Sequence, residues 1–201
     1  MILNDILNDV YMECPGCSRT VMQQQLRLVA RDFCVRTEAW TDFVTKDIVA
    51  DTEAYNLNTG YSANIQRILW VKYGESATED NTSPLDPYLY KLEDEWTLTL
   101  LFDCPSAITD GLYVKMALRP QFGGVSDSPN DLPEWFIDRY SDVLSAGTKA
   151  KLMRMLKMPW GNAEMSQFYN RLYDNGVNMA NIESKYSDFK DGAIIVEQRK
   201  I

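Results

Sequence analysis

The spacing of apolar residues predicts helices at the N-terminal end of the chain. Residues 2–12 place Ile, Leu and Val at positions 2, 3, 6, 7 and 10, with Asn and Asp on the other face, which is helical spacing. Pro15 and Gly16 then break the pattern, and Ser18 is a suitable N-cap for a second helix that ends near Arg36. Two helices joined by a short turn predict an αα-hairpin.

Between Asp42 and Gln121 the hydrophobic period changes from that of a helix to that of a strand. Apolar and polar residues alternate at 68–73, 96–102 and 112–119, and residues 43–57 are expected to add another strand. Residues 74–87 are polar and rich in turn formers, which predicts an exposed loop. This part of the chain therefore predicts a small antiparallel sheet or sandwich of four or more strands.

Helical periodicity returns after Pro120. Asp131 is expected to cap a helix that begins near Leu132, and residues 149–157 are expected to stay helical. Gly147 lies where two helices could approach closely, and Asn162 is a suitable cap for a last helix over about 163–188. Inward positions are expected at Leu152, Met153 and Leu156. Core packing is expected to account for the aromatic residues of this region, which are Trp135, Phe136, Tyr140, Trp160, Phe168 and Tyr169.

The order of helices, strands and helices predicts an α+β fold. We expect a helical bundle formed from the N- and C-terminal helices, with an inserted antiparallel β-domain. The expected divisions are residues 1–41 for the N-terminal helical hairpin and 42–121 for the β-domain. Residues 122–189 would supply the C-terminal helices, and 190–201 an extended tail.

Composition narrows the classes of function. Of 201 residues, 45% are hydrophobic, enough for a packed core. Acidic residues outnumber basic ones by 29 to 20, giving a net charge of −9, which disfavours a nucleic-acid binder. There is no apolar run long enough for a membrane span and no secretory signal pattern, so an intracellular origin and no membrane partner are expected.

The cysteines offer one motif that could carry chemistry. Cys14 and Cys17 flank Pro-Gly, and a Cys-X-X-Cys pair at a helix N-terminus can serve redox chemistry or bind zinc. A thioredoxin-like site would need a βαβ context, and zinc would need two more ligands, for which only Cys34 and Cys104 are available because the chain has no histidine. The favoured interpretation is a Pro-Gly turn with cysteines as small apolar residues. No phosphate-binding loop or nucleophile elbow is present, so no catalytic or cofactor site is expected.

The C-terminal third carries an ordered set of short motifs. These are Leu132-Pro133-Glu134-Trp135-Phe136, then Ala146-Gly147-Thr148-Lys149 followed by a Leu, then Met158-Pro159-Trp160, and last Gln167-Phe168-Tyr169 with Tyr173. This order resembles that of the head-to-tail adaptor (connector) proteins of tailed bacteriophages. In that family Leu-Pro opens a helix, an Ala-Gly-Ala-like step follows, and Pro-Trp breaks the chain before the last helix. Thr148 departs from the family pattern. The remainder of the chain fits only in its architecture.

The resemblance implies a structural virion protein rather than an enzyme. Such adaptors form a ring, usually dodecameric, beneath the portal protein, where they extend the DNA channel and hold tail or nozzle proteins. DNA would pass without specific binding. The implied location is the head–tail interface of the virion, after synthesis in the host cytoplasm. The alternatives are another virion ring protein, such as a tail terminator or nozzle, and a thiol-redox or zinc protein using Cys14 and Cys17.

Two groups of residues are candidates for this role. In the C-terminal tail, Asp191-Gly192 is a turn signal, and a β-prone apolar segment follows it, so the tail is expected to dock on the portal or, alternatively, to pair with the chain's own β-domain. The docking candidates are Gly192, Ala193, Ile194, Ile195, Val196, Glu197, Arg199, Lys200 and Ile201. Carboxylates in the lumen would repel DNA, and an ordinary solvated surface is the alternative. The candidates are Glu75, Glu79, Asp80, Glu93, Asp94 and Glu95.

Overall fold

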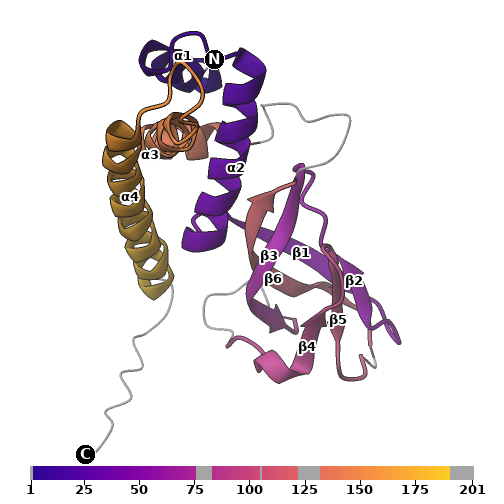
Figure 1. Ribbon diagram of the computed structural model, residues 1–201. Helices are drawn as coiled ribbons and strands as arrows, with labels where there is room; N and C mark the ends of the chain where they lie inside the picture. Colours follow the sequence, from indigo (N-terminus) through magenta and orange to yellow (C-terminus); the bar gives the residue numbers. More distant parts are fainter. Residues whose placement is uncertain (1, 76–82, 105, 122–131, 191–201) are drawn as a thin grey trace, which may run out of the picture.

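The helices from the two ends of the chain pack together as one bundle (Figure 1). The computed structural model describes residues 2–75, 83–104, 106–121 and 132–190. The N-terminal helices are α1 (Ile2–Glu13) and α2 (Arg19–Thr37), and the C-terminal helices are α3 (Glu134–Met153) and α4 (Ala163–Lys190). α3 contacts all three other helices. The predicted α+β fold, with a bundle built from both ends, is confirmed.

Local signals fix three of the helix ends. The Ser18 hydroxyl accepts a hydrogen bond from the backbone N–H of Val21, and the Asn162 side chain accepts from the N–H groups of Glu164 and Met165. Both caps were predicted, because a short polar side chain can bind the free N–H groups of a first helical turn. α2 ends at Thr37, and the C-cap residue Glu38 has a left-handed backbone with φ of 52°.

The inserted part of the chain forms two small antiparallel sheets. The first contains β1 (Thr41–Ile48), β6 (Ile108–Pro120) and β3 (Ala63–Tyr73), in that order. The second contains β2 (Ala54–Asn56), β5 (Thr97–Leu100) and β4 (Tyr90–Leu92), the last preceded by a short 3-10 turn, Pro87–Leu89. The sequence suggested one strand over residues 43–57. The structure divides this stretch between two sheets, because Asp51 takes a positive φ of 58° in the turn that separates them.

Trp40 joins the β-domain to the bundle. Its side chain is buried, and its ring lies 6.2 Å from that of Phe136 on α3 and 5.8 Å from that of Tyr61. Its backbone carbonyl accepts a 2.7 Å hydrogen bond from the N–H of Leu118 on β6. The bundle and the first sheet therefore share one hydrophobic core, with α2 next to β6 (Figure 1).

The C-terminal helices differ from expectation at their boundaries. The N-cap position of α3 is Pro133, which has no side-chain cap, and the expected cap Asp131 lies outside the described residues. α3 ends at Met153 rather than near residue 157, because turns occupy the chain up to Gly161. Leu156 lies in these turns and is 64% exposed, so the prediction that it packs inward is wrong.

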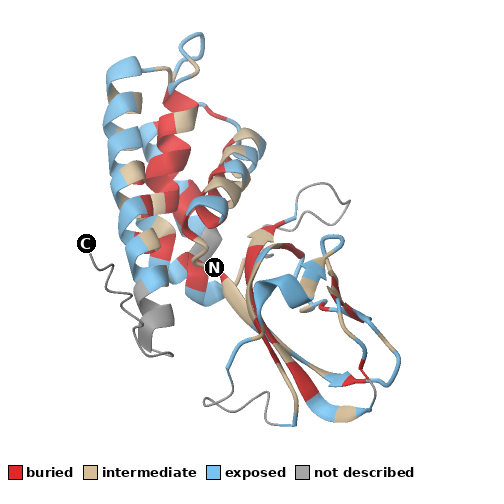
Figure 2. Cartoon of the chain, turned by 90° about the horizontal axis from the view of Figure 1, so that it is seen from below, coloured by how far each residue is buried: buried red, intermediate tan, exposed pale blue. Residues whose placement is uncertain are grey.

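Two aromatic residues predicted to be in the core lie on the surface. Trp135 and Phe168 are 46% and 47% exposed, whereas Phe136 and Tyr140 are buried as predicted. Figure 2 shows the buried positions gathered along α3 and the inner sides of its neighbours, with α4 exposed along its outer side. The outer surface of the bundle therefore carries large apolar side chains that the other described residues do not cover.

Candidate functional site

Cys14 and Cys17 form a buried turn between α1 and α2. The N–H of Cys17 donates to the carbonyl of Cys14 over 3.2 Å, and Gly16 between them has a φ of 84°, a left-handed conformation that favours glycine. Burial and the neighbouring Cys17 raise the pKa of Cys14 to about 11, and burial also raises the pKa of Cys17. Because the thiolate is the reactive and metal-binding form, this setting favours a structural role.

The other two cysteines do not complete a metal site. Cys34 is buried in α2, and burial raises its pKa, whereas Cys104 follows β5 in the inserted domain. Within the described residues no three Cys, Asp or Glu side chains come together in a way that could hold a metal ion. None of the helices in the same part of the chain is long and apolar enough to cross a membrane.

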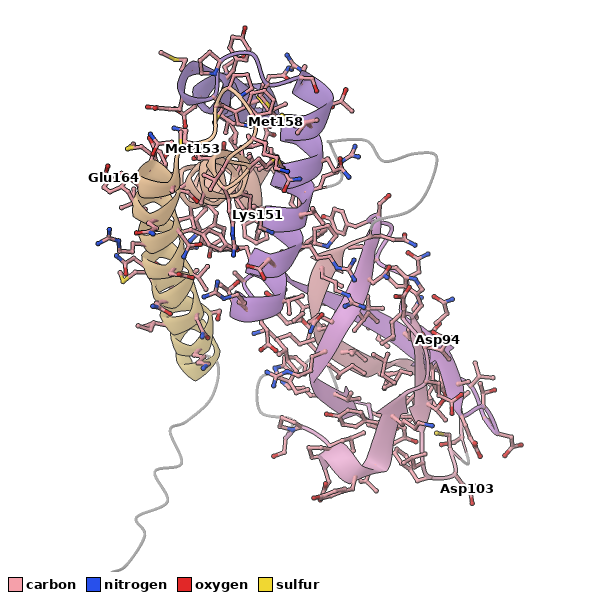
Figure 3. The ribbon with its side chains drawn as sticks, in the orientation of Figure 1. Asp94, Asp103, Lys151, Met153, Met158 and Glu164 are labelled. Atoms are coloured by element: carbon pink, nitrogen blue, oxygen red, sulfur yellow. The ribbon has the colours of Figure 1, made fainter. Side chains whose placement is uncertain are left out.

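The acidic candidates Glu93, Asp94 and Glu95 lie in the exposed turn between β4 and β5. Figure 3 labels Asp94 in the β-domain. Asp94 accepts hydrogen bonds from the N–H groups of Trp96 and Thr97, both over 2.7 Å, and these lower its pKa. Asp94 is therefore a turn-forming residue that stays ionised. Two cations partly neutralise its neighbours, since Glu93 lies 3.7 Å from Lys91 and Glu95 lies 3.7 Å from Arg119.

The structure does not bring all the acidic candidates together. The carbonyl of Glu95 accepts from the N–H of Ile65 near the start of β3, whereas Glu75 follows the end of that strand, ten residues further on. At about 3.3 Å per strand residue the separation is about 30 Å. Glu79 and Asp80 lie outside the described residues.

The predicted docking segment, Gly192 to Ile201, also lies outside the described residues. Its placement therefore stays a prediction.

A basic pocket lies where α3 leads into α4, and the sequence patterns did not single it out. It has a volume of about 590 Å³ and is lined by Ala150, Lys151, Arg154, Leu156, Ala163, Ser166, Gln167, Asn170 and Arg171. Three of these side chains are cationic, and no carboxylate is among them. Within the described residues Lys151, Arg154 and Arg171 have no ion pair. Figure 3 shows Lys151, Met158 and Glu164 near this corner of the bundle.

An acidic pocket lies between α1 and the first half of α3. Its volume is about 380 Å³, and it is lined by Asp5, Ile6, Asp9, Asp138, Ser141, Asp142 and Ser145. Asp9 is paired with Lys149 at 2.9 Å, but Asp5, Asp138 and Asp142 have no ion pair with a described residue. Asp138 and Asp142 are four residues apart and exposed, so they project from one face of α3.

α4 carries an exposed apolar stripe. Phe168, Leu172, Met179 and Ile182 are between 44% and 63% exposed. Spacings of four, seven and three residues put all four on one face of a helix. Scattered exposed apolar residues are ordinary, but four large ones along one stripe are typical of a surface that meets another protein.

The fold is α+β, and its described surface carries an exposed apolar stripe on α4 and two pockets of opposite charge beside α3. No protein-family model matches the chain, and no curated protein matches it significantly.

Proposed function

We propose that this chain is the subunit of a head-to-tail adaptor ring of a tailed bacteriophage. The ring, dodecameric by resemblance, would bind beneath the portal protein, extend the DNA channel and hold tail or nozzle proteins. The chain would act at the head–tail junction of the virion, after synthesis in the host cytoplasm, without catalysis or a cofactor.

The observation that carries the proposal is the agreement between the ordered motifs and the helix boundaries. Leu132-Pro133 directly precede α3, and Gly147 lies within it. Pro159-Trp160 lie in the connection to α4, and the closing tyrosines lie on α4 itself. Two of the motifs have a structural reason of the kind that the resemblance implies: Pro133 occupies the N-cap of α3, and Gly147 permits close packing of helices.

The space around Gly147 is too small for a larger residue. A Cβ atom there would lie 2.7 Å from Cδ2 of Tyr173 on α4 and 2.7 Å from Cγ1 of Val29 on α2. Such separations are well inside van der Waals contact, so the residue allows three helices to meet. Tyr173 and Gly147, both members of the resembling motif set, are therefore in direct contact.

The exposed apolar side chains of the bundle support assembly with other subunits rather than function as a monomer. The large side chains of the α4 stripe and of Trp135 are not covered by the other described residues of one copy. In a ring each subunit meets two neighbours, so two sides of the bundle become buried. A tail-terminator or nozzle protein is a weaker candidate, because such rings are dominated by β-structure and this chain has a four-helix bundle among its described residues.

The acidic turn between β4 and β5 fits a role beside DNA. Glu93, Asp94 and Glu95 are exposed, and the hydrogen bonds to Asp94 keep it charged. If the turn faces the lumen, its carboxylates repel phosphates over about 8 Å at physiological salt. Glu75, at the opposite end of β3, would then lie away from these lumen-facing carboxylates.

The test is assembly of the full chain with the portal protein encoded in the same genome. We expect native mass spectrometry and electron microscopy of the mixture to show a closed ring with equal numbers of the two subunits. Phe168→Glu together with Leu172→Glu should abolish the complex, because charges would replace the apolar stripe. Gln24→Glu together with Thr45→Glu adds the same charge at exposed positions on α2 and β1, away from the stripe; it is the control and should leave the complex intact. A chain that never associates with the portal overturns the proposal.

A further inference from the structure

The basic pocket at the α3–α4 corner has no carboxylate among its described lining residues. Lys151, Arg154 and Arg171 line one pocket in a chain of net charge −9, and no carboxylate lines it with them. The first residue of α4, Ala163, also lines the pocket, so the positive end of the helix dipole adds to the field. Like charges gathered in one hollow repel each other, and a bound anionic group relieves this repulsion.

The acidic flank of α3 provides such a group on the opposite side of the same helix. Asp142 and Lys151 are nine residues apart, which is two and a half helical turns, and so their side chains leave α3 in opposite directions. Asp138 and Arg154, which directly follows α3, also lie on nearly opposite sides of the helix axis. One copy of the chain cannot bring its own acidic flank into its own basic pocket, but two copies can bring them together.

We propose that the acidic flank of one copy, formed by Asp5, Asp138 and Asp142, docks on the basic pocket of the next. The inference rests on the proposed ring, for which it names the two surfaces that meet. Because the surfaces differ and face opposite ways, the contact is head-to-tail, the kind of contact that forms a ring when the rotation between copies divides a full turn. A symmetric dimer formed through either surface alone would instead put like charges together.

Apolar residues accompany the charges on both surfaces. Leu156 lines the basic pocket and is 64% exposed, while Trp135 is 46% exposed and lies three residues before Asp138, on the same side of α3. A tryptophan placed beside arginine side chains gains a cation–π contact as well as burial. Trp135 is therefore the expected anchor of the contact, with the aspartates around it selecting the partner and its orientation.

Charge-swapped variants of the full chain test this contact. The pocket variant carries Arg154→Glu and Arg171→Glu, and the flank variant carries Asp138→Lys and Asp142→Lys. All four positions are exposed on helices or at a helix end, so the bundle should fold in both. Two controls make the same changes of net charge on the β-domain. They are Lys46→Glu with Lys91→Glu, and Glu53→Lys with Asp103→Lys; Figure 3 shows Asp103 at the end of the β-domain far from the helices.

We expect the unaltered chain to self-associate at low salt, as measured by sedimentation equilibrium, and less so as salt rises. Each swapped variant alone should associate about 100-fold more weakly, because like charges then face each other. An equimolar mixture of the two should recover association, since each variant's flank is complementary to the other's pocket. The β-domain controls should behave as the unaltered chain.

Several outcomes overturn the inference. These are an unaltered chain that stays monomeric at every salt concentration, swapped variants that associate normally, or a mixture that does not recover. Binding of a short DNA duplex that the pocket variant alone loses would assign the pocket to nucleic acid instead.

Capture by the portal protein distinguishes failure of this inference from failure of the proposed function. If the swapped variants still join the portal in full number, the ring stands and these surfaces do not form it; if the unaltered chain is not captured, the ring itself fails.

Discussion

Lys149 on α3 and Asp9 on α1 form an ion pair 2.9 Å long in which the two partners differ widely in exposure. The Lys149 side chain is 8% exposed and the Asp9 side chain 54%. Burial on its own would raise the pKa of Asp9, but hydrogen bonds from the Ser145 hydroxyl and from Lys149 outweigh it and hold that pKa below its ordinary value. The Lys149 ammonium therefore relies on Asp9 and other protein groups to balance its charge, whereas water can solvate the Asp9 carboxylate.

This asymmetry predicts unequal effects of removing either partner. Asp9→Asn should destabilise the protein by about 1–3 kcal/mol, because it leaves the buried Lys149 charge without its counter-ion. Lys149→Met should cost no more than about 1 kcal/mol, since the exposed carboxylate of Asp9 regains water and the methionine keeps most of the packing. Urea denaturation at neutral pH measures both, and equal losses would contradict the interpretation.

The same pair gives a pH dependence with a definite sign. A carboxyl whose pKa is lower in the folded state stabilises the protein above its unfolded pKa, and this contribution is lost as the pH falls through the folded pKa. The difference in stability between the unaltered chain and Asp9→Asn should therefore shrink as the pH falls below about 4. Denaturation curves at a series of acidic pH values test this, and a constant difference would count against it.

Gly147 predicts a packing effect that opposes helix propensity. Alanine is favoured over glycine in a helix by about 1 kcal/mol. At position 147, however, the new methyl group would meet Val29 and Tyr173 at 2.7 Å, and overpacking costs about 1–3 kcal/mol. We expect Gly147→Ala to lower the thermal midpoint, whereas the exposed Asn178→Ala on α4 should not. A gain in stability at Gly147 would show that the helices can move apart freely.

The cysteine turn predicts tolerance of a change that removes both thiols. Cys14→Ala with Cys17→Ala should keep the fold and the association behaviour, at a cost of about 1 kcal/mol for each lost sulfur contact. The raised pKa of Cys14 also predicts slow labelling of the native protein by a thiol reagent at neutral pH. Bound zinc in the purified chain, or lost assembly with an intact fold, would restore the metal or redox hypothesis.

The features that the sequence predicted well are local in origin. The caps at Ser18 and Asn162 depend on side chains that reach N–H groups two or three residues away, so the sequence carries the whole interaction. The turn at Gly16 is also local in origin, because it depends on the left-handed backbone of a single glycine. The end of α3 was predicted four residues too late, because residues 154–157 keep a helix-like composition while their backbone already forms turns.

The features that the sequence missed depend on how distant segments meet. Periodicity places Trp135 and Phe168 on helix faces, but it does not show whether a face meets the core or a partner. The basic pocket joins the end of α3 to the start of α4 and exists only once the chain has turned between them. The sequence does carry a signal for this pocket, since the basic residues Lys151 and Arg154 fall opposite the acidic Asp138 and Asp142. That signal can be read only when the exact extent of α3 is known.

Tyr173 predicts how stability changes at alkaline pH. Its hydroxyl on α4 donates to the Asp32 carboxylate on α2 over 2.8 Å, and Arg36 lies 5.6 Å from its ring. Burial is the main cause of its raised pKa, the Asp32 carboxylate adds to it, and Arg36 opposes it only in part. Above a pH of about 10 the unfolded chain releases this proton while the folded chain keeps it. Stability must therefore fall as the pH rises through that range.

Tyr173→Phe isolates this contribution. At neutral pH the variant should lose about 0.5–1.5 kcal/mol with its hydrogen bond, because the half-exposed Asp32 can take water in exchange. As the pH rises above about 10 the loss should diminish, since phenylalanine has no proton to release and the variant lacks this part of the alkaline decline. Tyr88→Phe, at a site 88% exposed, is the control and should follow the unaltered chain. Other tyrosines titrate in both proteins, so only the difference between the two urea midpoints reports on Tyr173. If that difference stays constant from neutral to alkaline pH, the buried hydroxyl does not link α4 to α2 in the way that the structure indicates.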